Sequence, residues 1–253
     1  MLKTLNLSIA VLKMFTKDKP TWGGRELATE MNMNHTNLYR ILETFENNGF
    51  ITKDPITKKY SLGIAVWEIG MHMYDSLNVE QLCMPILEEL KDITGETSIF
   101  TVLNGLEALT LLKAEPVNKV KFSVSRGSRT PLYVGASYRA MLAFLSEEQI
   151  SQVIDVPLKS YTSNTMTDSA VIRAELQKIR ENGYASSYSE YTADVLALAM
   201  PVFNSEHEVV GSITVSGPTY RFTEEHIEGT LRPLTDAKRE IEAIIRRYHL
   251  NFN

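Results

Sequence analysis

The first 62 residues set out a helix, a polar turn, a second helix and a basic hairpin, and this order constrains the fold more than any other feature of the chain. The spacing of apolar residues predicts one helix over 25–31 and another over 35–47. Asn34 is placed to cap the second helix. Two β-prone stretches, 50–53 and 58–62, flank a turn that contains proline. These elements in this order predict a winged helix-turn-helix, in which the second helix enters the major groove of DNA.

The exposed side of the predicted second helix and the hairpin carry the groups that such a domain needs. Amide, hydroxyl and guanidinium groups read base edges or bind phosphates, and lysines bind the phosphate backbone. We expect contacts to double-stranded DNA from Arg25, Asn34, His35, Thr36, Asn37, Tyr39, Arg40, Lys53, Lys58 and Lys59. The same residue types also form solvated surfaces, and winged helices also bind proteins. The pattern alone therefore leaves a protein-interaction module open as an alternative.

The charge distribution favours contact between the N-terminal part and nucleic acid. The whole chain has a formal charge of −5, but residues 1–62 have nine basic and six acidic side chains, against 17 and 25 in the rest. A basic N-terminal part on an otherwise acidic chain is typical of a protein in which only that part contacts the phosphates of nucleic acid.

The composition is that of an ordinary globular protein, with 43% hydrophobic and 23% charged residues. No apolar run reaches the roughly 18 residues that span a bilayer. The apolar positions of residues 5–12 fall on one helical face, which predicts a first helix rather than a signal peptide. The single cysteine, Cys83, excludes an internal disulfide and fits a reducing compartment. We therefore expect a cytoplasmic protein without membrane contact.

The rest of the chain mixes helices and strands. The spacing predicts helices over 63–78, 79–93, 137–145, 171–182 and 223–248, and strands over 97–103, 106–113, 119–125, 195–203 and 209–216, with a turn at Asn104-Gly105. About five antiparallel strands with helices at the sides make an α+β sensor-like domain. Cys83 falls near the inward stripe of its helix, which favours core packing over a nucleophilic role.

Three parts follow from this reading. Residues 1–62 form the DNA-binding domain, 63–78 a linker helix, and 79–253 the sensor domain. The linker helix is long enough to bury one face on its own domain and another on a second chain. An ordinary core helix would show the same pattern, but DNA readers usually pair two heads over two half-sites, which favours a homo-oligomer.

Three blocks of sequence carry a resemblance to a known family. They are GRELATEMNMNHTNLYRILETFENNGFITKDPITKKYSLG in the head, GASYRAMLAFLSEEQI in the middle, and NTMTDSAVIRAELQKIRENGYASSYSEY followed by LALAMPVFNSEHEVVGSITVSGP in the tail. In this order they make the chain similar to the IclR family of bacterial transcriptional regulators over essentially its whole length. The resemblance implies a winged-helix head, a linker helix and a ligand domain akin to GAF and PAS folds. It also implies dimers or tetramers on palindromic operators near catabolic genes, usually as repressors.

The resemblance also implies a small-molecule effector, most often a carboxylate, a sugar acid or an aromatic acid. Carried over by motif, the lining of its pocket would include Phe122, Ala136, Ser137, Ser187, Val195, Ala197, Thr214 and Ser216. Backbone N–H groups of Ala136 and Ser137 at a helix start suit a carboxylate, the hydroxyls can orient it, and the apolar side chains supply a wall. Any single hydroxyl could equally well form a hydrogen bond within a strand or at a helix cap instead of binding a ligand. The prediction of a pocket therefore depends on the whole set of residues.

The chain departs from the family pattern in this region. The middle block usually reads Gly-Lys where this chain has Tyr138-Arg139, and a glycine usually lies near Asp194. We expect Tyr138 to narrow the pocket and Arg139 to add charge if it points inward. Asn6 stands where members usually carry a basic residue. These differences affect the identity of the effector more than the fold.

No catalytic constellation is found in the sequence. It has no phosphate loop of the G-x-x-x-x-G-K type, no G-x-G-x-x-G and no G-x-S-x-G nucleophile elbow. Its five histidines do not fall at metal-ligand spacing with one another or with the cysteine. We therefore expect no enzyme, no metal and no cofactor, with an enzyme carrying a winged-helix appendage as the weaker alternative.

Overall fold

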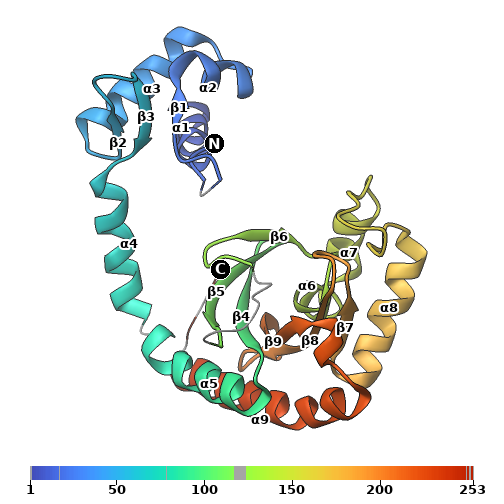
Figure 1. Ribbon diagram of the computed structural model, residues 1–253. Coiled ribbons are helices and arrows are strands. Elements are labelled where there is room, and N and C mark those ends of the chain that lie inside the picture. The colour runs from blue at the N-terminus through green and yellow to red at the C-terminus, as the bar shows by residue number, and fades with distance from the viewer. Residues whose placement is uncertain are drawn as a thin grey trace. The chain divides into compact units, whose positions relative to one another are not determined.

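The computed structural model describes residues 2–16, 18–77, 79–116, 124–248, 250 and 252, and the side chains of these residues except 73–77. The chain divides into two compact units, residues 1–78 and 79–253. Figure 1 shows both units.

In the N-terminal unit, three helices pack with a small antiparallel sheet, and a fourth helix follows them. The helices are α1 (Lys3–Lys13), α2 (Gly24–Glu30) and α3 (His35–Asn47), and the strands are β1 (Trp22–Gly23), β2 (Ile51–Lys53) and β3 (Lys59–Leu62), in the order β1-β3-β2. Helix α4 (Ile64–Leu77) follows. The apolar side chains of α1, α2, α3, β2 and β3 form one core that includes Val11, Leu27, Leu38, Leu42 and Ile51. This arrangement confirms the predicted winged helix-turn-helix.

The C-terminal unit is built on a six-stranded antiparallel sheet in the order β6-β5-β4-β9-β8-β7. Its strands are β4 (Thr97–Asn104), β5 (Glu107–Ala114), β6 (Arg129–Pro131), β7 (Ala185–Tyr188), β8 (Val195–Phe203) and β9 (Val209–Pro218). Its helices are α5 (Val79–Thr94), α6 (Ala136–Leu142), α7 (Glu147–Ile154), α8 (Ser169–Asn182) and α9 (Glu224–Tyr248), with a short 3₁₀ helix at Thr219–Arg221. The sheet curls, with α5 and α9 packed together along its outer side and α6 on its inner side (Figure 1).

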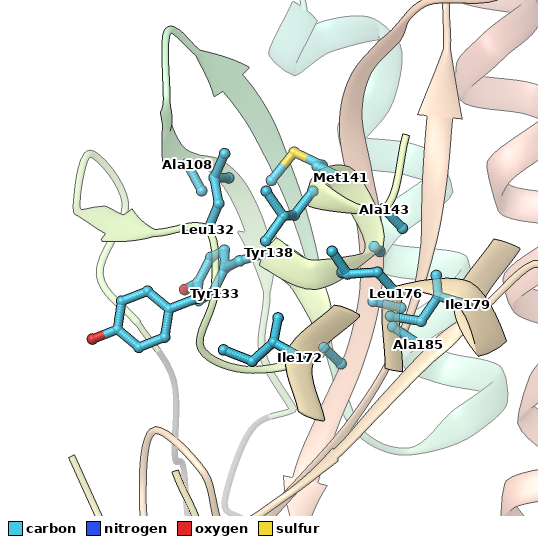
Figure 2. Close-up of a cluster of buried hydrophobic side chains, with 14 of the residues drawn as sticks. Ala108, Leu132, Tyr133, Tyr138, Met141, Ala143, Ile172, Leu176, Ile179 and Ala185 are labelled. Atoms are coloured by element: carbon cyan, nitrogen blue, oxygen red, sulfur yellow. The ribbon is translucent and has the colours of Figure 1, made fainter. Parts of the chain in front are cut away.

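A core of buried side chains joins α6 to α8 and to the sheet. Ile172, Leu176 and Ile179 of α8 recur at the spacing of one helical face and point toward α6 (Figure 2). Asp168 begins α8 by accepting a hydrogen bond from the Ala170 N–H at 2.8 Å, and Gly183 ends it with a φ of 76°. The predicted α+β class is thereby confirmed.

The observed elements differ from the predicted ones in a few places. Asn104 pairs with Glu107, so the hairpin turns at Gly105-Leu106, one residue later than predicted, because Gly105 supplies the positive φ at the first turn position. Strands β1, β6 and β7 were not predicted, since they have only two to four residues and show no periodicity. The predicted strand over 119–125 lies outside the described residues up to 123.

None of the helices in the described ranges combines the length and the hydrophobicity that crossing a bilayer requires.

The burial of Cys83 makes a first prediction. The Cys83 side chain is 0% exposed, and burial raises the pKa of its thiol to about 11. Because the thiolate is the reactive form, we expect no reaction of the folded protein with an aromatic disulfide reagent at pH 8, and one equivalent of reaction in guanidinium chloride. Rapid labelling of the native protein would contradict the core assignment of this thiol.

Candidate functional site

Helix α3 presents polar side chains on one side and packs apolar side chains on the other. Leu38, Ile41 and Leu42 are buried in the N-terminal core. The exposed residues of α3 include five of the predicted DNA contacts, His35, Thr36, Asn37, Tyr39 and Arg40. The helix therefore has the two-sided character that a recognition helix requires.

Asn34 and Tyr39 have structural roles on this helix. The Asn34 Oδ1 accepts a hydrogen bond from the Thr36 N–H at 2.9 Å, which confirms Asn34 as the N-cap. Tyr39 lies against Gly24 so closely that a Cβ at position 24 would come within 2.7 Å of the tyrosine Oη. Glycine at position 24 therefore allows α3 to pack with Tyr39 against the start of α2.

The hairpin of β2 and β3 places cations at its exposed edge. The Asp54 Oδ1 accepts hydrogen bonds from the N–H groups of Ile56 at 2.9 Å and Thr57 at 2.6 Å, and these bonds hold the pKa of Asp54 below its usual range. Lys58 adopts a φ of 59° in this turn. The remaining predicted DNA contacts, Arg25, Lys53, Lys58 and Lys59, are all exposed.

The C-terminal unit contains a cavity of about 60 Å³ between the sheet and the start of α6. Its lining includes seven of the eight residues predicted for an effector pocket, Ala136, Ser137, Ser187, Val195, Ala197, Thr214 and Ser216. The eighth, Phe122, lies outside the described residues. Tyr138, which was expected to narrow the pocket, also lines the cavity. The sequence did not point to the remaining lining residues, which are Ile99, Val124, Gly135, Glu190, Tyr191 and Thr192.

The register of the sheet explains why these small side chains meet. Ser187, Ala197 and Ser216 stand directly opposite one another across β7, β8 and β9, so they share one face of the sheet. Thr214 lies two residues before Ser216 and opposite Ile99, so both join the same face. The Ser137 hydroxyl of α6 lies 2.7 Å from the Thr214 hydroxyl and closes the cavity from the other side.

A buried ion pair lies beside the cavity. Arg139 is 0% exposed and its guanidinium forms a two-bond pair with Glu190, with Nη2 donating to Oε1 at 2.8 Å and Nη1 donating to Oε2. Arg139 also donates to the Ser186 carbonyl oxygen at 3.0 Å, and the Gly135 N–H donates to Glu190 Oε2 at 3.3 Å. Arg139 does not line the cavity. The condition under which Arg139 would add charge to the pocket is therefore not met, because the guanidinium lies in the core and Glu190 balances its charge.

Tyr138 contributes a wall of the cavity. Its side chain is 5% exposed, and burial raises the pKa of its hydroxyl to about 12. Its ring meets the edge of the Tyr191 ring, with the centroids 6.4 Å apart. Tyr191 in turn contacts Tyr161 at 4.9 Å between centroids.

The loop between β7 and β8 carries Glu190 and Tyr191 to the cavity. Both of its ends, Ser189 and Asp194, adopt a positive φ, of 53° and 59°. The Thr165 hydroxyl donates to the Glu190 carbonyl oxygen at 2.7 Å and holds the loop from outside. Asp194 thus takes up the left-handed conformation, which glycine adopts most readily. Within the described ranges, no three His, Cys, Asp or Glu side chains gather as a metal site would need.

Comparison with known proteins identifies the chain. The model of the IclR helix-turn-helix domain matches residues 8–55, and that of the bacterial transcriptional regulator IclR C-terminal domain matches residues 71–243. The chain belongs to the IclR family of bacterial transcriptional regulators. It is a DNA-binding regulator with a ligand-binding domain, and its relatives are regulators rather than enzymes.

Several relatives match this IclR regulator along almost all of its length. The HTH-type transcriptional regulator KipR of Bacillus subtilis is 33% identical over 240 residues, which cover 94% of this chain and 95% of KipR. The HTH-type transcriptional repressor AllR of Escherichia coli is 24% identical over 244 residues, covering 96% of this chain and 90% of AllR. A crystal structure of a putative IclR regulator from a Silicibacter species superposes with a TM-score of 0.89 at 27% identity, covering 96% of each chain.

The buried ion pair makes a prediction about stability. Arg139→Met leaves the Glu190 carboxylate buried without its cation, and we expect a loss of about 3–5 kcal/mol in the free energy of unfolding by urea. Arg139→Met combined with Glu190→Gln removes both charges and should lose less than the sum of the two single variants. Additive losses would contradict a direct coupling between these side chains.

Proposed function

We propose that this IclR regulator is a repressor that binds a palindromic operator near catabolic genes and is controlled by a small organic acid in the α6 cavity. The observation that carries the proposal is the cavity lining, where hydroxyls from α6, β7 and β9 converge on one cavity of the ligand domain. Hydroxyls and small apolar side chains suit a small polar ligand that must be oriented. The printed name of AllR, a repressor, supports the sign of regulation.

The DNA contacts in this proposal divide by chemistry. His35, Asn37 and Arg40 on the exposed side of α3 read base edges, and Thr36, Tyr39 and Asn34 support the same helix. Arg25 and the hairpin lysines, Lys53, Lys58 and Lys59, bind phosphates. The protein works in the cytoplasm, where bacterial DNA lies.

A homo-oligomer is part of the proposal. Ile64, Trp67 and Ile69 of α4 are each more than half exposed within the N-terminal unit, and a run of exposed apolar side chains marks a surface that meets another chain. Two heads on two half-sites give a dimer, or a dimer of dimers on a longer operator. The divisions 1–62, 63–78 and 79–253 then serve as reader, connector and sensor.

Control of DNA binding requires that the ligand prefers one arrangement of the two heads. A ligand that binds two states equally changes nothing, so only its differential affinity shifts the population. A coupling of about 1–3 kcal/mol, which is about five- to 150-fold in operator affinity, is typical of such regulators.

The first test is a gel shift on the DNA that flanks the gene, repeated over a salt series. Arg40→Ala should weaken operator binding by about 1–3 kcal/mol, because it removes a base-edge contact. Arg239→Ala, at an exposed position of α9 in the other unit, is the matched control and should bind as the wild type does. A wild-type affinity that does not fall with salt would instead support the protein-interaction module, since phosphate contacts release counterions.

The second test concerns the cavity. Ser137→Leu puts a larger apolar side chain into the cavity, so we expect a variant that binds the operator but does not respond to an acid that releases the wild type. A panel of small organic acids, tested on the gel shift, supplies that acid. Ser186→Leu, at an exposed position next to Ser187, is the control and should respond normally. A normal response of Ser137→Leu would place the effector elsewhere.

A further inference from the structure

We propose that Tyr138 sets the size limit of this cavity, so that the wild-type protein admits only ligands smaller than an aromatic ring. The tyrosine ring fills space that would otherwise belong to the cavity. As an account of effector choice, the inference rests on the proposed function. The size limit itself concerns only the cavity.

The cavity is smaller than the space that an aromatic ring needs. The space is about 60 Å³. One water needs about 10–15 Å³ by this measure, so the cavity holds about four to six atoms of that size. An engineered apolar cavity that binds benzene in another protein measures about 150 Å³. A benzene ring therefore does not fit here unless a lining side chain gives way.

The packing of Tyr138 shows that its ring does not give way easily. It follows Ser137 in α6, and its side chain is 5% exposed. Its ring belongs to the buried cluster with Ala108 and Leu132 (Figure 2) and meets Tyr191 edge to face. Swinging the ring out of its place would leave a void in a close-packed core, which is costly.

The rest of the lining explains why Tyr138 is the limiting residue. Most of the other lining side chains are alanine, serine, threonine and glycine, which have little left to remove. Among the lining residues that the structure describes, Tyr191 is the second aromatic one, and it is partly exposed. Truncating Tyr191 would open the cavity toward solvent, whereas truncating Tyr138 enlarges it inside the domain.

The experiment measures ring binding directly on the purified full chain. We would titrate 4-fluorophenol and follow its ¹⁹F NMR signal with wild type, Tyr138→Ala and Tyr138→Phe. The expected result is saturable binding of one equivalent by Tyr138→Ala, at least about tenfold tighter than any binding by the other two. Tyr138→Phe is the matched control, because it keeps the ring and loses only the hydroxyl. Equal binding by wild type or by Tyr138→Phe would overturn the proposal.

A folded Tyr138→Ala that fails to bind would also overturn it, so circular dichroism and thermal unfolding accompany the titration. If Tyr138→Ala does not fold, Tyr138→Val is a milder truncation, and the absence of ring binding in that folded variant would overturn the proposal equally. Supporting evidence for the location is loss of ring binding when Ser137→Leu is added to Tyr138→Ala.

A gel shift with the same probe separates this inference from the proposed function. If 4-fluorophenol binds Tyr138→Ala and also changes its operator affinity, the result supports both the size limit set by Tyr138 and the control of DNA binding by this cavity. If it binds without any effect on the operator complex, the size limit stands and the control of DNA binding by this cavity loses support. If it does not bind, the size limit falls, while the response of wild type to a small acid still tests the proposed function.

Discussion

The Arg139–Glu190 pair is the interaction on which the cavity depends. It ties the start of α6 to the loop after β7, two segments 51 residues apart, and adds a bond to the Ser186 carbonyl oxygen. A buried charge is costly unless it is paired and hydrogen-bonded, so neither segment can move away alone. The N–H of Gly135 adds a further bond to the same carboxylate. The two segments that carry Ser137, Tyr138 and Tyr191 are thus fixed to each other before any ligand arrives.

The sheet supplies the opposite wall by its register alone. Residues two apart on one strand, and opposite on the next, share a face, so Ser187, Ala197, Thr214 and Ser216 gather without any loop to position them. Because these side chains are small, α6 approaches closely enough for the Ser137 and Thr214 hydroxyls to meet. The cavity is therefore small for two reasons. Helix α6 lies close to the sheet, and the large ring of Tyr138 forms part of the wall.

Local signals in the sequence predict local structure well here. The bounds of α3 and the caps of α8 follow from apolar spacing and from Asn34, Asp168 and Gly183, each of which acts within a few residues. The short strands carry no such signal. The environment of Arg139 could not be predicted, because its partner lies far along the chain in a loop without periodicity. The sequence also could not tell that Glu190 and Tyr191 line the cavity, although both fall in a block that resembles the family.

One strand of the sheet links the cavity to the first helix of the C-terminal unit. Ile99 lines it and belongs to β4, whose next residue on the N-terminal side, Ser98, donates a hydrogen bond to the Leu87 carbonyl oxygen of α5 at 2.6 Å. Helix α5 begins at Val79, two residues after α4 ends at Leu77. Helix α5 therefore packs directly against the strand that supplies Ile99 to the cavity. By comparison, α6 and the loop after β7 are joined to each other by the buried Arg139–Glu190 pair, so the two sides of the cavity are held by different contacts.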